Sequence, residues 1–297
     1  EKSLTYFIAE IGSNFDGDLD RAIKLIKLAK DVGADAAKFQ HYTANSLVSD
    51  KGFSSLNLDS HQKDWEGTVY EIYDKASLNV AWTEVLAKEC KKQGIDFMTS
   101  PYSFELLEKT IDFIPAIKVG SGDITFHQII KKMSTFGKPI LLATGASDIE
   151  EVKDSMNLIY KKIPTCIMQC NTNYEANENH LCNQNIKVIE TYKKIWPEAQ
   201  YGLSCHMKNN LGVLAAVSMG ARVIEKHFTD DNNRNGPDHK FALNVEEFRE
   251  MINSVRLLEK ILGDGKKKIE NNEKSTFFLQ RRALVAKKDL EKGSIIK

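Results

Sequence analysis

The chain has 297 residues, of which 42% are hydrophobic and 28% are charged, and its formal net charge at pH 7 is zero. This length and composition suit one large α/β domain, or two smaller ones, with a sizeable buried core. The balanced charge gives no reason to expect nucleic acid or an anionic membrane as a partner, and the apolar stretches are too short to span a bilayer.

The first elements expected along the chain are a strand and a helix. The apolar run YFIAEIG predicts the strand, and residues 19–29 carry apolar side chains at helical spacing. Asp18 is placed to cap the start of this helix, and Gly33 is placed to end it. The chain is therefore expected to begin with a strand–helix unit.

The same unit recurs along the chain. The later strand candidates are AAKFQHY, DFMTSPY, AIKVGSGD, PILLATG, TCIMQC, YGLSCH and ARVIEKHF. Further helices are expected near residues 82–93, 103–111, 126–136, 148–162, 185–195, 209–219 and 244–263. Eight alternating units predict a parallel sheet with right-handed crossovers that closes into a (β/α)8 TIM barrel. The alternative is an open doubly wound sheet, which is disfavoured because no G-x-G-x-x-G motif follows the first strand.

Three segments depart from this alternation of strands and helices. Residues 43–67 form a long polar insertion after the second strand, and residues 230–240 form a polar loop after the eighth. Long loops at the carboxyl ends of strands build the active site of a barrel. The last segment, RRALVAKKDLEKGSIIK, predicts a strand and a turn. We expect a barrel over residues 1–265, a solvated linker over 266–280, and the first strand of an antiparallel domain within 281–297.

Polar side chains interrupt nearly every strand candidate at its carboxyl end. A strand buried on both faces should be almost wholly apolar, and polar groups are costly to bury without partners. In a closed barrel these groups would converge on one mouth. They are Glu10, Lys38, Gln40, Ser100, Lys118, Ser121, Asp123, Thr144, Asn171, Thr172, Tyr174, Ser204, His206, Glu225 and His227.

The polar residues at the mouth suggest two kinds of binding site. Lys38 and Lys118 are cations on different strands among hydroxyl groups, which suits a phosphate, or a phosphate and a carboxylate. His206 and His227 end successive strands at matching points, which suits a divalent metal with open coordination positions. Each lysine could instead pair with a nearby acidic residue, and each histidine could be a hydrogen-bonded barrel residue. The acidic residues, with Asp238 in the last loop, could act as acids, bases or hydroxyl-binding groups.

The cysteines and the N-terminus bear on where the protein works. Five cysteines are an odd number, and their irregular spacing favours reduced structural thiols over a disulfide framework or a zinc site. The N-terminus shows neither the basic region nor the long apolar region of a signal peptide. These features predict a cytoplasmic protein.

A series of motifs between about residue 5 and residue 290 gives a more specific indication. They are, in order, IAEIGSNFDGDLDRA, GADAAKFQ, YEIYDKASL, TSPYS, IKVGSGD, FGKPILLATG, YGLSCH, GARVIEKHF and GPDH. Together they resemble the sialic acid synthases, which condense phosphoenolpyruvate with an N-acetylmannosamine-like amino sugar to give a nonulosonic acid and phosphate. The resemblance implies Mn²⁺ or Mg²⁺ and no nucleotide cofactor. It also implies a homodimer in the full-length form and an antifreeze-like domain that begins near residue 281.

The resemblance also assigns roles to residues at the expected mouth. Glu10, His206 and His227 match catalytic positions, and the two histidines match the metal ligands. The positions that match phosphoenolpyruvate contacts are Lys38, Ser100, Lys118, Ser121, Thr172 and Ser204. The positions that match contacts to the acceptor sugar are Gln40, Asp64, Asp123, Tyr174 and Asp238.

Some residues depart from the pattern of the family. Asp123 stands where glutamate is usual, Ala143 where serine is usual, and Cys205 where aspartate is usual. One alternative is a related 3-deoxy-ulosonate synthase that uses a phosphorylated aldose, but only Arg234 and Lys240 offer it a further basic cluster. A second alternative is a catalytically inactive barrel with a binding or assembly role. The retained lysines and histidines favour the active synthase.

Overall fold

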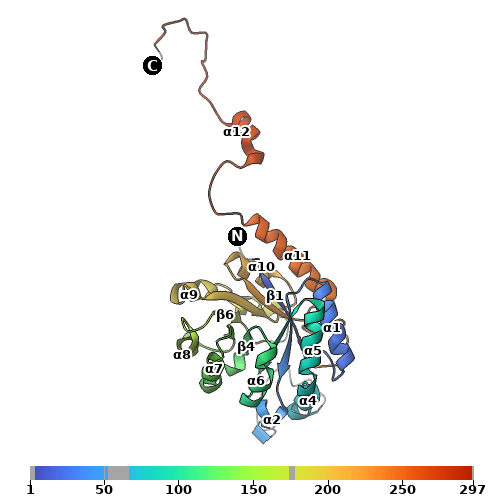
Figure 1. Ribbon diagram of the computed structural model, residues 1–297. Coiled ribbons are helices and arrows are strands. Elements are labelled where there is room, and N and C mark those ends of the chain that lie inside the picture. The colour runs from blue at the N-terminus through green and yellow to red at the C-terminus, as the bar shows by residue number, and fades with distance from the viewer. Residues whose placement is uncertain (1–3, 50, 53–66, 174–177, 296–297) are drawn as a thin grey trace. The chain divides into compact units, whose positions relative to one another are not determined.

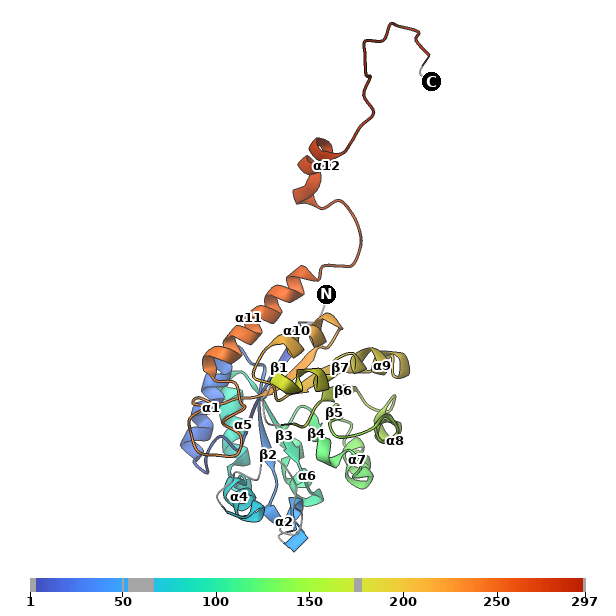
Figure 2. The same ribbon diagram turned by 180° about the vertical axis from the view of Figure 1, so that it is seen from behind.

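The computed structural model describes residues 4–49, 51–52, 67–173 and 178–295, and it divides into two units, residues 1–261 and 262–297. In the first unit, eight parallel strands form one sheet in the order β3-β2-β1-β8-β7-β6-β5-β4. The strands at the two ends of this order, β3 and β4, are in contact, so the barrel is nearly closed. Helices surround the strands (Figure 1 and Figure 2). The predicted TIM barrel is confirmed, and the sheet is not the open, doubly wound alternative.

The eight strands lie at the eight expected places. Their bounds are β1 Tyr6–Gly12, β2 Ala36–His41, β3 Asp96–Pro101, β4 Ile117–Val119, β5 Ile140–Ala143, β6 Thr165–Cys170, β7 Gln200–Cys205 and β8 Val223–His227. Because all eight run parallel, their carboxyl ends lie on one side of the barrel. That side carries the polar residues singled out above, as far as they lie within the described ranges.

The helices follow the strands as predicted. Their bounds are α1 Leu19–Asp31, α5 Thr83–Gln93, α6 Phe104–Thr110, α7 His127–Ser134, α8 Ile149–Ile159, α9 Val188–Ile195, α10 Leu211–Ser218 and α11 Val245–Ile261. Asp18 caps α1 by accepting the N–H groups of Asp20 and Arg21. Gly33 follows the helix with a φ of +92°, a conformation that favours glycine. Both predicted boundaries of helix α1 are therefore confirmed.

In the described residues after β2, the chain forms two helices that the hydrophobic pattern did not predict. They are α2 Ala44–Leu47 and α4 Val69–Ala76, and residues 53–66 between them are outside the described part of the chain. Helix α4 begins with a capping box, in which Thr68 accepts the Glu71 N–H while the Glu71 side chain accepts the Thr68 N–H. Short 3-10 turns complete the connections: η2 Val80–Trp82, η3 Ile111–Phe113, η4 Ser121–Asp123 and η5 Glu178–Gln184.

The barrel interior changes from apolar to polar along each strand. A buried apolar cluster fills its lower part, consisting of Ile8, Ala36, Met98, Leu141, Cys166 and Met168. Side chains in a strand alternate between its two faces, so the residue two positions further along points the same way. Glu10 and Lys38 follow Ile8 and Ala36 at this spacing. In the ladder, Glu10 pairs with both Lys38 and His227, so these side chains emerge at one level.

The outer faces of the same strands pack against the helices. Phe7, Phe39 and Phe97 alternate with the inward residues, and all three are buried in the main hydrophobic core. Burial of apolar surface is the dominant stabilising contribution to a fold of this kind. The mouth residues are therefore carried by strands that are fixed by packing on both faces.

The second unit begins with a turn and a short helix, η6 Asn271–Glu273 and α12 Lys274–Gln280, within the segment expected to be a linker. The strand expected within residues 281–297 is not formed in the described residues 281–295, where no strand partner is present to pair with it. The first unit ends at Ile261, close to the boundary expected at residue 265. Across the described residues, the helices are all too short or too polar to cross a membrane.

Candidate active site

The carboxyl ends of the strands surround a pocket of about 290 Å³. Most of the predicted site residues line it: Glu10, Lys38, Gln40, Ser100, Lys118, Ser121, Thr172, Ser204, His206, His227 and Asp238. Asp123 lies in turn η4 beside Ser121, but it is not among the residues that line the pocket. Asp64 and Tyr174 fall outside the described residues.

Two lysines and two carboxylates form a buried cluster in this pocket. The Nζ of Lys38 is 2.6 Å from Glu10 Oε2 and 3.8 Å from Glu225 Oε2. The Nζ of Lys118 is 3.3 Å from the other oxygen of Glu225, Oε1. All four residues are no more than 6% exposed. Buried charges are tolerated when opposite charges surround them, so each residue of the cluster depends on the others.

Neutral side chains complete the hydrogen bonding of the cluster. Gln40 Nε2 donates to Glu10 Oε1 at 2.6 Å, and Lys38 Nζ donates to Ser100 Oγ at 3.3 Å. Ser204 Oγ donates to Glu225 Oε1 at 3.2 Å. The sequence left open whether the lysines pair with nearby acidic residues, and they do.

The two carboxylates of the cluster have pKa values that diverge. Burial raises the pKa of Glu10 to about 7, against the opposing charge of Lys38. Burial also acts to raise the pKa of Glu225, but the ammonium groups of Lys118 and Lys38 outweigh it and lower that pKa. Two carboxyl groups that ionise at different pH can take different acid–base roles.

The two histidines lie side by side next to this cluster. Their ring centroids are 5.5 Å apart, and Phe241 packs edge-on against both rings. His206 Nδ1 is hydrogen-bonded to the backbone carbonyl of Asn171 at 2.9 Å. Burial lowers the pKa of His206 to about 4, and it also holds the pKa of His227 well below its usual range. Both imidazoles are therefore neutral near pH 7.

Neutral imidazoles are the form that binds metal ions. Within the described residues, no group of three or more histidine, cysteine, aspartate or glutamate side chains is placed to hold a metal. The two rings fit a divalent ion that would take its remaining ligands from water or substrate. The donor set therefore suits an open catalytic site better than a closed structural one.

A small group of hydrogen-bonding side chains lies at the ends of β4, β5 and β6. Ser121 Oγ accepts the backbone N–H of Gly145 at 3.0 Å. A Cβ atom on Gly145 would lie 2.7 Å from Thr172 Cγ2 and 2.8 Å from Ser121 Oγ, so a methyl group there would displace these side chains. The hydroxyls of Ser121 and Thr172 are of the kind that donates to phosphate oxygens.

The wall of the pocket beyond β2 and β3 is aromatic and apolar. The rings of Tyr42 and Tyr73 meet edge to face with centroids 5.6 Å apart, and those of Tyr42 and Tyr102 do so at 6.1 Å. Leu47 and Val48, at the end of α2, line the same wall. The pocket thus has charged groups on one side and apolar surface on another.

The sequence prediction missed two parts of the site. It noted Glu225 among the polar residues but gave it no definite role, although it joins both lysines. Its position two residues before His227 on one strand places both on the same face, and that spacing was a usable signal. The sequence prediction also missed the aromatic and apolar wall, because two of its residues, Leu47 and Val48, belong to the insertion after β2.

The fold and the site together define a (β/α)8 barrel enzyme with a buried, charge-paired pocket at the carboxyl ends of its strands. Residues 25–267 of the chain match the NeuB family, so the chain belongs to that family. This confirms the resemblance seen in the motifs, and with it the prediction of an enzyme of the synthase class.

Named relatives and a solved structure agree with this placement. The chain is 34% identical to N,N'-diacetyllegionaminic acid synthase of Campylobacter jejuni, over 98% of this chain and 87% of the relative. It is 30% identical to human N-acetylneuraminate-9-phosphate synthase, over 98% and 80%. The N-acetylneuraminic acid synthetase of Leptospira borgpetersenii, solved with citrate, superposes with a TM-score of 0.81 at 26% identity, covering 94% of each chain.

Proposed function

We propose that this enzyme condenses phosphoenolpyruvate with the open-chain form of an N-acetylated amino sugar, similar to N-acetylmannosamine. The products would be a nonulosonic acid and phosphate. The observation that carries the proposal is the buried Lys38–Glu10–Glu225–Lys118 cluster next to two neutral histidines. Membership of a family whose named relatives make such acids supports it.

The two lysines suit the anionic groups of phosphoenolpyruvate. When the substrate enters, its phosphate and carboxylate would share the ammonium groups of Lys38 and Lys118 with the two glutamates. Such contacts are strong in a buried pocket because water screens them little. The hydroxyls of Ser121, which accepts the Gly145 N–H, and of Thr172 would then donate to phosphate oxygens.

The aromatic wall suits the acceptor. A sugar chain carrying an N-acetyl methyl group presents apolar C–H surface, which packs well on tyrosine rings such as those of Tyr42 and Tyr73. Gln40 and Asp238 line the same pocket and would bind hydroxyl or amide groups of the sugar. This division of the pocket would bring the two substrates together in a fixed orientation.

The proposed chemistry forms a carbon–carbon bond and a carbon–oxygen bond to water, and it breaks the carbon–oxygen bond to phosphate. C3 of phosphoenolpyruvate attacks the aldehyde carbon, the aldehyde oxygen takes up a proton to become a hydroxyl, and positive charge develops at C2. Water adds at C2, and the bond between C2 and the phosphate oxygen then breaks to release phosphate. With a pKa of about 7, Glu10 is able to accept the proton of this water near neutral pH. The lysines would stabilise the departing phosphate.

We also propose that His206 and His227 hold a divalent metal, Mn²⁺ or Mg²⁺. When bound, it would supply Lewis-acid polarisation of the aldehyde oxygen. The protein itself would keep both rings neutral through burial, and it orients His206 through the Asn171 carbonyl.

The rival enzymatic function uses a phosphorylated aldose as acceptor. That reaction needs further cations for a second phosphate. Of the two basic residues that the sequence offered for this purpose, Arg234 donates its Nε–H to Asp16 at 2.8 Å. The Nε of its guanidinium is thus engaged by the loop after β1, which favours an acceptor without phosphate.

The proposal is tested by phosphate release from phosphoenolpyruvate with a panel of N-acetylated hexosamines, their 6-phosphates and phosphorylated aldoses, with and without Mn²⁺. We expect release with an unphosphorylated N-acetylated sugar and metal, and loss of release in His206→Ala. Release only with a phosphorylated aldose would support the rival, and no release with any sugar would support an inactive barrel. Full activity of His206→Ala after metal stripping would exclude the metal role.

A further inference from the structure

The carboxylate of Asp238 lies against the backbone at the end of β1. Its Oδ2 accepts the backbone N–H of Ser13 at 3.1 Å and lies 3.8 Å from His227 Nδ1. A Cβ atom on Gly12 would lie 2.6 Å from the same oxygen, and Gly12 has a φ of +53°, which favours glycine. The backbone of β1 is therefore shaped to let this carboxylate approach.

The next residue, His239, is fully buried and is held at both ring nitrogens. Its Nδ1 lies 2.8 Å from Thr229 Oγ1, and its Nε2 lies 2.8 Å from Asp16 Oδ1. Asp16 belongs to the loop between β1 and α1 and has a φ of +54°, which is uncommon for a residue other than glycine. One imidazole thus ties the loop after β8 to the loop after β1.

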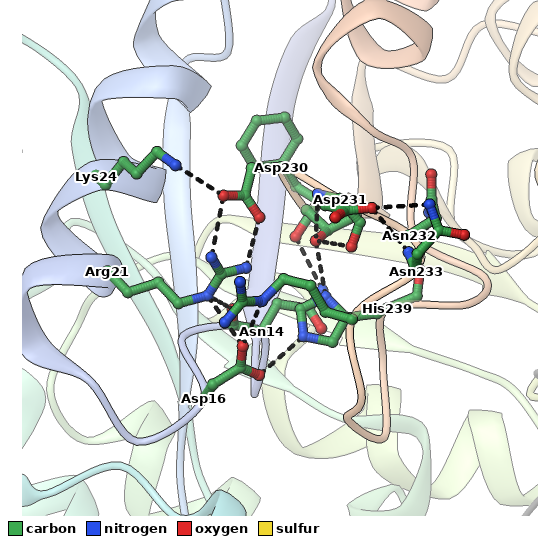
Figure 3. A network of polar contacts seen from close by, with 12 residues as sticks. Asn14, Asp16, Arg21, Lys24, Asp230, Asp231, Asn232, Asn233 and His239 are labelled. Carbon is green, nitrogen blue, oxygen red and sulfur yellow. Dashed lines mark hydrogen bonds and ion pairs between the residues drawn. The ribbon is translucent and has the colours of Figure 1, made fainter.

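A network of ion pairs holds Asp16 in turn, as Figure 3 shows. The Nε atoms of Arg21 and Arg234 lie 3.1 Å and 2.8 Å from Asp16 Oδ2. Arg21 also binds Asp230 with two hydrogen bonds, of 3.0 Å and 2.5 Å. Lys24 lies at the outer end of this network, where it pairs with Asp230 and is 61% exposed. The network thus runs from His239, which is fully buried and adjoins Asp238 in the chain, to the exposed Lys24.

We infer that Asp16 and His239 are positioning residues, which fix the carboxylate of Asp238 at the mouth of the pocket. Asp238 adjoins His239 in the chain, so clamping the imidazole limits where that carboxylate can move. A misplacement of about 1 Å is enough to weaken a substrate contact strongly. The inference rests on the proposed function in one respect, namely that Asp238 contacts the acceptor sugar.

The test compares Asp16→Asn and His239→Gln with Lys24→Ala, a matched control at the exposed end of the same network. We expect the first two variants to raise the KM for the acceptor about tenfold, the effect of losing one well-placed polar contact. The KM for phosphoenolpyruvate should stay within about twofold, and Lys24→Ala should change neither constant. Adding Asp16→Asn to Asp238→Asn should raise the acceptor KM no further, because both act through one carboxylate.

Hydrogen exchange of the Ser13 amide gives a readout independent of activity. It should become faster in Asp16→Asn and His239→Gln and stay unchanged in Lys24→Ala. If either buried variant fails to fold, Thr229→Val removes the other hydrogen bond of His239 at nearly constant volume and should show the same shift. Unchanged acceptor KM and unchanged Ser13 exchange in the folded variants would overturn the inference and leave the network a structural tie. If the wild type releases no phosphate with any sugar, the proposed function fails, and Ser13 exchange alone decides the positioning role.

Discussion

At the scale of single residues, the site depends on charges that are buried together. Lys38 reaches both Glu10 and Glu225, and Lys118 reaches Glu225 from the opposite side. Phosphoenolpyruvate would bring further negative charge into this cluster. The raised pKa of Glu10 then matters, because a carboxylate in this crowded cluster readily takes the proton of the attacking water.

The cluster predicts that the effect of Lys38 on activity can be separated from its effect on stability. Lys38→Met should abolish phosphate release and cost about 3 kcal/mol in the free energy of unfolding, because a buried carboxylate loses its partner. The double variant Lys38→Met/Glu10→Gln should recover most of that stability and none of the activity. Denaturant unfolding and phosphate assays measure the two effects. A double variant as unstable as the single one would contradict the paired-charge account.

Asp123 predicts a pH dependence of stability. Burial raises its pKa from 3.8 to about 6, so the folded chain binds this proton more tightly than the unfolded chain does. Its contribution to stability is therefore present below the unfolded pKa and is lost as pH rises through 6. Asp123→Asn should stabilise the protein by about 1 kcal/mol at about pH 7.5, allowing for partial solvent screening, and by little at about pH 4. Thermal unfolding of both proteins at the two pH values checks this. Equal stabilisation by Asp123→Asn at the two pH values would argue against a raised pKa of Asp123.

The sequence located most of the mouth residues but not their pairing. Lys38 and Lys118 could be recognised because charged residues at the ends of apolar strands are unusual. Their partners were less certain, and Lys118 pairs with Glu225 on a strand more than a hundred residues later. Such contacts depend on strand register and tilt around the barrel, which no local pattern encodes. The central role of Glu225 can therefore be recognised only from the structure.

At the scale of elements, the end of each strand places polar residues at the pocket, and the loops that follow the strands complete the site. The strand–helix rhythm was predictable, because apolar periodicity and caps such as Asp18 are local signals. Helix α4 was not found, since its eight residues are too few for helical periodicity to stand out, although its capping box is visible in the sequence. It carries Tyr73, so the aromatic wall escaped the prediction along with the helix.

The loop after β5 predicts a selective loss of phosphoenolpyruvate binding. In Gly145→Ala, the new methyl group would press on Thr172 and Ser121 and displace the hydroxyls that we propose bind phosphate. The KM for phosphoenolpyruvate should rise about tenfold or more, while the KM for the sugar changes little. Gly212→Ala, in helix α10, serves as the control, because its Cβ would meet only ordinary contacts at 3.8 Å. A change of similar size in both variants would count against the assignment.

At the scale of the whole molecule, the barrel is a unit with its own core. Its buried clusters lie within residues 1–261, and almost all described side chains of residues 262–295 are exposed. The fold could be predicted because all eight strands carry the same repeating signal. The strand expected within 281–297 rests on a single local pattern and on the family resemblance, and a strand forms only where a neighbouring strand pairs with it.

A chain ending at residue 265 should therefore keep the stability of the barrel. Its Tm should lie within about 2 °C of that of the full chain, because the buried clusters of the barrel lie within residues 1–261. Differential scanning calorimetry of both chains at equal concentration provides the comparison. A much lower Tm for the shorter chain would show that the C-terminal unit stabilises the barrel.

The central claim is that phosphoenolpyruvate supplies a carbon nucleophile and then loses phosphate by cleavage of its C2–O bond. The most direct measurement uses phosphoenolpyruvate labelled with ¹⁸O at the bridging oxygen, together with the enzyme, metal and acceptor sugar. We predict that the label leaves with the phosphate, that the new acid carries oxygen from water at C2, and that release requires the sugar. Label retained in the organic product, or phosphate released equally without sugar, would contradict the account.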